Sequence, residues 1–200
     1  MGAVVEPGGR VRLRAVREAD PPRFRAWAEN PEVARCFLGG GPARPDPGDW
    51  VPEHPAGPWA QRRPAGACRP AGHVVRVIET LDEEPLGWIE LRDANWRRRS
   101  GELRVCLGDP ATWGRGYGSE AIRLFLDLAF LRWRLQSVHL RVATWNTRAV
   151  RAYQRCGFRR EALLRAGRHA AEGMDDLWLM RADAPAAAPA PAAARPAQGA

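Results

Sequence analysis

The residues best suited to binding a charged ligand gather in one stretch of this 200-residue chain, Trp113-Gly-Arg-Gly-Tyr-Gly-Ser119. Three glycines within five residues let successive backbone N–H groups face a single point. A helix is expected to begin at Gly116, and its free N–H groups and dipole would add positive potential at that point. Arg115 contributes a full charge. The stretch therefore predicts a phosphate cradle, against the alternative of a tight strand-to-helix turn without a ligand.

The type of phosphate ligand is narrowed by residues that are absent from the sequence. A Walker loop requires lysine before Ser or Thr, and the chain contains no lysine. The run from Gly116 to Ala121 fits the looser dinucleotide pattern G-x-G-x-x-A. That pattern expects an acid about 20 residues later to hold a ribose, yet no acid lies between Asp127 and Glu161. Nicotinamide binding is therefore disfavoured.

A second motif follows, Asn146-x-x-Ala149-x-x-x-Tyr153-x-x-x-Gly-Phe158. In this order and spacing, the two motifs together resemble those of the GCN5-related N-acetyltransferase (GNAT) superfamily. The family's Gln/Arg-x-x-Gly-x-Gly/Ala pattern falls on residues 113–118, with Trp113 where Gln or Arg is usual. The resemblance covers roughly residues 10–180, and within the superfamily the sequence resembles the ribosomal-protein-alanine N-acetyltransferase subgroup.

This resemblance implies that acetyl-CoA is the co-substrate, that no metal is needed, and that an acetyl group moves to an amine. A thioester is already activated, so direct transfer in a ternary complex requires no covalent enzyme intermediate. By resemblance, Tyr153 would protonate the departing thiolate. Glu102 is the candidate base, Glu90 and Asp93 lie on the strand before it, and a water chain is the alternative. The residues expected at the coenzyme are Leu107, Gly108, Trp113, Gly114, Arg115, Gly116, Tyr117, Gly118, Ser119, Asn146 and Ala149.

The acceptor amine is left open between a protein N-terminus and a small molecule. All 31 cations are arginine, and residues 92–168 hold 17 of them against 6 acids. Such a basic half disfavours polyamine acceptors and favours an acceptor near RNA, such as a ribosomal protein. Two other functions remain as alternatives. One is a non-catalytic domain that senses acyl-CoA, and the other is an RNA-binding protein using the arginines at 97–99 and 159–160.

The elements that must position these motifs predict an α/β (α+β) single domain with a mixed, mostly antiparallel sheet flanked by helices. Strands are expected at 11–15, 73–80, 86–91, 101–107, 138–143 and 176–180. Helices are expected at 20–29, with Asp20 as its N-cap and Pro31 stopping it, at 116–133, and at 147–156 with Gly157 as the C-cap. We expect an extension at 1–9, an acetyltransferase domain at 10–181 with a Pro/Gly-rich insert at 39–72, and a disordered Ala/Pro tail at 182–200.

Composition excludes several classes of protein. No run approaches 18 apolar residues, which argues against a membrane-spanning helix. The N-terminus lacks the apolar core of a secretory signal, so a cytoplasmic protein is expected, as a monomer or homodimer. The 4 cysteines show no metal-ligand spacing, and Cys106 and Cys156 fall on core-like positions.

Overall fold

The computed structural model describes residues 6–38, 72–166 and 175–185. Most of the expected insert and tail therefore lies outside the described residues. Eight strands form one sheet in the order β1-β2-β3-β4-β5-β6-β8-β7. They are β1 (Glu6–Pro7), β2 (Val11–Arg14), β3 (Val74–Thr80), β4 (Pro85–Asn95), β5 (Ser100–Leu107), β6 (Ser137–Ala143), β7 (Arg159–Leu164) and β8 (Leu177–Asp183). The helices are α1 (Asp20–Glu29), α2 (Pro31–Leu38), α4 (Tyr117–Asp127) and α5 (Thr147–Arg155), with the short turns η1 (Pro110–Thr112) and η2 (Leu128–Arg132).

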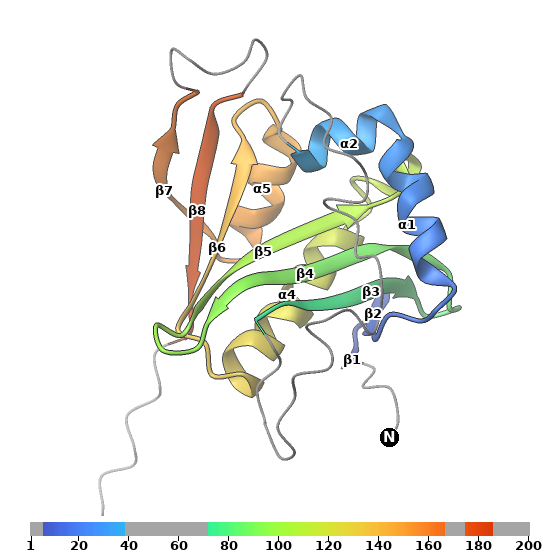
Figure 1. The fold of residues 1–200 in the computed structure, drawn as a ribbon, viewed down its shortest axis with the longest axis horizontal. Coiled ribbons are helices and arrows are strands. Elements are labelled where there is room, and N and C mark those ends of the chain that lie inside the picture. The colour runs from blue at the N-terminus through green and yellow to red at the C-terminus, as the bar shows by residue number, and fades with distance from the viewer. Residues whose placement is uncertain (1–5, 39–71, 167–174, 186–200) are drawn as a thin grey trace, which may run out of the picture.

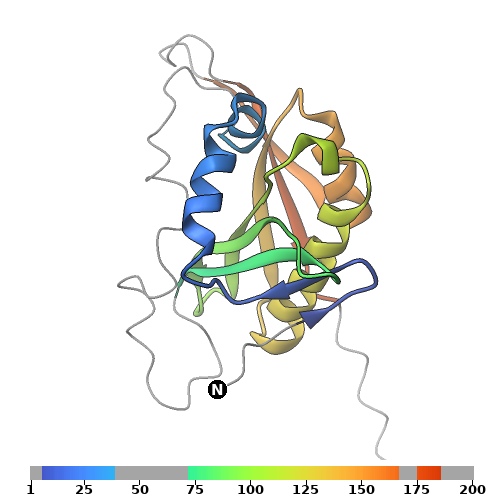
Figure 2. The ribbon, with the colours of Figure 1, turned by 90° about the vertical axis from the view of Figure 1, so that its right-hand side faces the viewer.

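The sheet lies between two helical layers (Figures 1 and 2). Helices α4 and α5 cover one face, where Leu13, Ile89 and Phe125 belong to the larger core cluster. Helices α1 and α2 cover part of the other face, where Phe24 and Trp88 belong to a second cluster. The predicted α/β class with a mixed, mostly antiparallel sheet is confirmed.

One pair of strands breaks the antiparallel pattern. Strands β5 and β6 are parallel, and the chain crosses between them through α4. In the described structure they pair only where residues 100–102 meet residues 137–139. Beyond this point the two strands diverge (Figure 1). Among the described strands, the edge of β5 beyond Glu102 thus has no strand partner.

The prediction that Pro31 stops a helix is half right. Helix α1 ends at Glu29 as expected, but Pro31 then begins α2. Proline is suited to the first helical position because its missing N–H would have no partner there. The side chain of Asn30 caps the new helix, since its Oδ1 accepts the N–H of Glu32 at 3.0 Å.

Asp20 is not the N-cap of α1, contrary to the prediction. It occupies the first helical position, and Ala19 precedes it without a capping side chain. The carboxylate of Asp20 is buried and receives two hydrogen bonds from Arg14, at 2.7 and 2.9 Å. The ion pair joins the end of β2 to the start of α1.

Other boundaries shift for local reasons. The long helix expected to end at Trp133 becomes α4 followed by a π-helical turn at 128–132. Strand β8 continues to Asp183, beyond the expected domain end, and residues 6–7 of the expected extension pair with β2. Strand β7 was missed because it is an edge strand with mostly exposed side chains, so it lacks apolar alternation. In the described residues, no helix is long and apolar enough to cross a membrane.

Candidate active site

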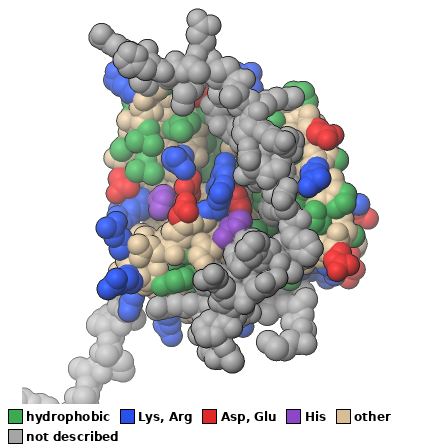
Figure 3. All heavy atoms as spheres, viewed as in Figure 1, with side chains coloured by type: hydrophobic (Ala, Val, Ile, Leu, Met, Phe, Trp, Pro, Cys, Tyr) green, Lys and Arg blue, Asp and Glu red, His purple; other side chains and the backbone are tan. Residues whose placement is uncertain are grey.

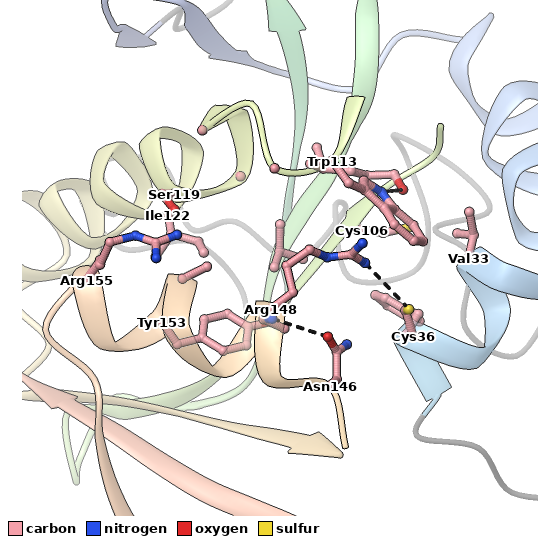
Figure 4. Close-up of a pocket in the computed structure, with 18 residues that line it drawn as sticks. Val33, Cys36, Cys106, Trp113, Ser119, Ile122, Asn146, Arg148, Tyr153 and Arg155 are labelled. Carbon is pink, nitrogen blue, oxygen red and sulfur yellow. Dashed lines mark hydrogen bonds between the residues drawn. The ribbon is translucent and has the colours of Figure 1, made fainter. Parts of the chain in front are cut away.

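A cavity of about 150 Å³, drawn in Figure 4, lies against the part of β5 that does not pair with β6. Its walls come from β5, the glycine stretch and first turns of α4, helix α5, and α2. Nine of the residues expected at the site line this cavity. They are Leu107, Trp113, Gly114, Gly116, Gly118, Ser119, Asn146, Ala149 and Tyr153. The two sequence motifs, far apart in the chain, therefore meet at one hollow.

The glycine stretch has the backbone conformation that its sequence requires. Gly114 and Gly116 have φ values of 77° and 91°, in the left-handed region that glycine adopts without steric cost. Gly116 precedes α4, and no side chain caps that helix end. The first N–H groups of α4 consequently have no intrahelical acceptor and face the cavity end of the helix. This arrangement suits an anion.

The β5 wall offers backbone groups to the cavity. The N–H of Gly108 donates to Leu86 of β4 at 2.9 Å. Because successive backbone groups in a strand point in opposite directions, the N–H of Leu107 points away from β4, into the gap. The carbonyl of Leu107 points the same way and accepts the indole N–H of Trp113 at 3.1 Å.

Helix α5 places Asn146 and Tyr153 on the opposite wall. Asn146 is buried, and its Oδ1 caps the helix by accepting the N–H of Ala149 at 3.2 Å. Two turns further on, Tyr153 lines the cavity and packs edge-on against Phe158, with 5.8 Å between ring centroids. Burial raises the pKa of the Tyr153 phenol well above its usual value. The phenol therefore stays protonated at neutral pH and is able to donate.

Four of the expected residues are not among those that line the cavity. Both carboxylate oxygens of Glu102 accept hydrogen bonds from Arg141, at 3.1 and 2.9 Å. Gly108 is needed for packing, since a Cβ there would lie 2.0 Å from the ring of Trp27. The carbonyl of Arg115 accepts a hydrogen bond from Arg10. Tyr117 packs partly buried against the larger core cluster.

The structure adds residues that the sequence analysis missed. Cys36 and Phe37 line the cavity from α2, a helix that was not expected at all. Arg148 also lines it, and its guanidinium carbon lies 3.9 Å from the centroid of the Trp113 ring. The same side chain donates to Cys36 Sγ at 3.8 Å (Figure 4). Arg148 directly precedes Ala149 of the second motif, and this position could have identified it as a site residue from the sequence.

Metal chemistry has no candidate centre in the parts of the chain that the structure describes. Those residues contain no group of three or more His, Cys, Asp or Glu side chains that could hold an ion. The thiols at Cys106 and Cys156 are buried, and burial raises the pKa of each above its ordinary value. The groups at the cavity that could bind or protonate a ligand include the N-terminal end of α4, the Leu107 backbone, Arg148 and Tyr153.

Comparison with known proteins identifies relatives. A family model described as "Acetyltransferase (GNAT) domain" matches residues 10–159. Spermidine N(1)-acetyltransferase of Vibrio cholerae is 33% identical over 88 residues, covering 44% of this chain and 50% of that protein. The Escherichia coli K12 protein of the same name is 29% identical over 83 residues, or 42% of this chain and 44% of that protein. The matches thus span about half the length of these relatives.

Solved structures show the same fold. Vibrio cholerae spermidine N-acetyltransferase in complex with CoA and spermine matches with a TM-score of 0.69 and 20% identity, over 87% of this chain and 95% of that chain. A dodecameric structure of that enzyme matches with a TM-score of 0.67 and 22% identity, over 88% and 95%. These relatives are spermidine acetyltransferases, so the expected kinship with the ribosomal-protein subgroup is not supported.

Proposed function

Because the chain belongs to the GNAT acetyltransferase family, we propose that it transfers the acetyl group of acetyl-CoA directly to a primary amine. The observation that carries this proposal is the cavity between β5, α5 and the glycine stretch before α4. It is bounded at one end by the glycine stretch and contains Tyr153. An anion site and a proton donor are thereby brought to one hollow, as acetyl transfer from a phosphorylated thioester requires.

The cavity walls suit the separate parts of acetyl-CoA. The uncapped N-terminus of α4 and the arginines at 148 and 155 provide positive potential for its phosphates. The pantetheine arm carries two amides. Past Glu102 the free edge of β5 could pair with these amides much as a sheet edge pairs with an added strand. The residues present therefore fit the coenzyme.

The chemistry follows from groups on facing walls. The amine attacks the thioester carbonyl, and the N–H of Leu107 is the backbone donor placed to stabilise the resulting oxyanion. The carbon–sulfur bond then breaks, and Tyr153 gives its phenolic proton to the departing thiolate. Tyr153 suits this step because burial keeps its phenol protonated at neutral pH, so a proton is available where the thiolate departs.

The acceptor class we propose is a polyamine of the spermidine type, and the relatives are the support for it. This choice replaces the sequence-based preference for an acceptor near RNA. The arginines that weighed against a polycation are accounted for in part by the coenzyme, because Arg148 and Arg155 line its proposed site. Assembly as a monomer or homodimer stays a prediction, which light scattering would test.

The test is acetyl-CoA-dependent thiol release with spermidine, an aminoglycoside and a panel of peptide N-termini, with mass spectrometry of the products. We expect N-acetylated spermidine and no release without an amine. Acetylation of peptides alone would overturn the acceptor class but retain the transferase. Folded protein that binds acetyl-CoA and acetylates none of these amines would favour an acyl-CoA sensor.

A further inference from the structure

A buried glutamate beside the cavity carries an oxygen atom without a hydrogen bond. Glu90 on β4 is 1% exposed, and no described residue donates to its Oε1. A buried carboxylate oxygen normally has a partner, because desolvation without one is costly. An unmatched oxygen next to a ligand cavity is therefore a candidate for contact with the ligand or with a water molecule that serves it.

The other oxygen of Glu90 is held firmly. Oε2 lies 2.6 Å from Nε2 of His73, which directly precedes β3. Nη1 of Arg104 is 3.9 Å from Oε1, beyond hydrogen-bonding distance. The other charged or titratable groups nearby are Cys106 on β5, Cys36 on α2 and Arg92 on β4. The carboxylate is thus fixed through Oε2, while Oε1 stays available.

The register of the sheet connects Glu90 to the cavity. Trp88 pairs with Cys106 across β4 and β5, and Glu90 pairs with Arg104. Glu90 and Cys106 are therefore diagonal neighbours on one face, a relationship that places side chains about 7–8 Å apart at Cα. Cys106 lines the cavity. One or two water molecules would span the remaining distance to an amine held there.

Arg104, which pairs with Glu90 across the strands, also links Glu90 to the cavity through helix α2. Its guanidinium lies 4.4 Å from the centroid of the Phe37 ring, and Phe37 lines the cavity. Acidic, basic and histidine side chains gather over the middle of this face of the sheet (Figure 3). Because Glu90 shares its sheet face with Trp88 and Arg104, it lies on the side of the sheet that faces α2.

We propose that Glu90 is the carboxylate that takes the first proton from the acceptor ammonium, directly or through water, with His73 as a positioning residue. This assignment rests on the proposed transferase function. An N–H bond of the ammonium breaks, an O–H bond forms at Oε1, and the nitrogen keeps the electron pair with which it attacks. The nitrogen loses two protons in all. One ends on the CoA sulfur by way of Tyr153, and the one held by Glu90 passes to solvent after the products leave.

Glu102, the base expected from the sequence, is less suited to this task. Both of its oxygens accept hydrogen bonds from Arg141 in a two-point ion pair. Neither glutamate lines the cavity, so the two differ in the hydrogen bonding of their oxygens. Glu90 is the acid on the same sheet face that keeps an unused oxygen.

The experiment compares kcat/KM for the wild type and Glu90→Gln from pH 7 to pH 10, with the amine that the wild type acetylates. At pH 7 we expect a loss of about a hundredfold in the variant. Near pH 10 much of an alkylamine is already neutral, so the ratio should fall at least about tenfold. Glu84→Gln, an exposed glutamate in the turn before the same strand, is the control and should keep the wild-type profile.

The outcomes separate this proposal from the one on which it rests. A loss that is constant from pH 7 to pH 10, or no loss, would overturn the role of Glu90. A wild type that acetylates no amine would overturn the transferase itself, whatever the variant does. Acetyl-CoA titration and thermal unfolding establish that the variant is folded. If it is not, His73→Gln serves instead, because His73 is partly exposed, and a pH-independent effect of that change would equally contradict the proposal.

Discussion

Arg148 and Trp113, which both line the cavity, contact each other across it. The guanidinium carbon lies 3.9 Å from the centroid of the indole ring, a geometry typical of a cation–π contact. Arg148 comes from the first turn of α5, and Trp113 comes from the glycine stretch before α4. The pair therefore joins the two motifs and puts a positive charge beside the proposed phosphate site.

Arg148→Ala should weaken acetyl-CoA binding. A hydrogen bond to a charged group contributes about 1.5–3 kcal/mol. Arg148 gives up its cation–π contact with Trp113 when it binds a phosphate, which offsets part of this gain, so we expect the variant to lose about tenfold in affinity. Isothermal titration measures it. The matched control is Arg151→Ala, one turn along the same helix and not among the residues that line the cavity. Equal affinities for the two variants would show that Arg148 does not contact the coenzyme.

The sequence predicted the parts of this site that lie in motifs. The positive φ angles of Gly114 and Gly116 and the capping role of Asn146 follow from local residue types. It missed contacts made by distant segments. The residues next to Glu102 in the sequence do not indicate that Arg141 pairs with it. Those next to Glu90 do not indicate that one of its oxygens lacks a hydrogen bond. Both features depend on how the strands align in the sheet. Helix α2 was missed because a proline that ends one helix equally well begins the next.

Gly108→Ala should destabilise the fold. A Cβ at this position would lie 2.0 Å from an atom of the Trp27 ring, so α1 would have to move away from β5. Overpacking of this kind lowers the free energy of unfolding by about 1–3 kcal/mol. Chemical denaturation measures the change. At Gly72 an added Cβ would meet its nearest neighbour at an ordinary 3.8 Å, so Gly72→Ala should stay within about 0.5 kcal/mol of the wild type.

The Arg14–Asp20 pair should make stability depend on acid pH. Burial alone would raise the pKa of Asp20, but hydrogen bonds from Arg14 and from the N–H of Arg17 outweigh it and hold the pKa below 3.8. A carboxyl whose pKa is lowered on folding stabilises the protein above its unfolded pKa, and this stabilisation is lost as the pH falls through the folded value. Stability should therefore fall below about pH 4.

Asp20→Asn tests this interpretation. Because a hydrogen-bonded charge pair is lost, we expect the free energy of unfolding at pH 7 to drop by about 1.5–3 kcal/mol. The difference between the variant and the wild type should shrink toward pH 3, because the Asp20 carboxyl of the unfolded wild type takes up its proton in this range. Denaturation curves across this range give both quantities. A difference that is the same at pH 3 and pH 7 would contradict the lowered pKa.

The most direct test of the account is the rate of acetyl transfer from acetyl-CoA to spermidine by the wild type and by Tyr153→Phe, with acetyl-CoA affinity measured on the same samples. Phenylalanine keeps the packing against Phe158 and removes only the proton donor. We predict a fall in kcat of about 10²-fold or more with unchanged affinity. Unchanged turnover in Tyr153→Phe, at unchanged affinity, would contradict the role of Tyr153 and with it the proposed chemistry of the cavity.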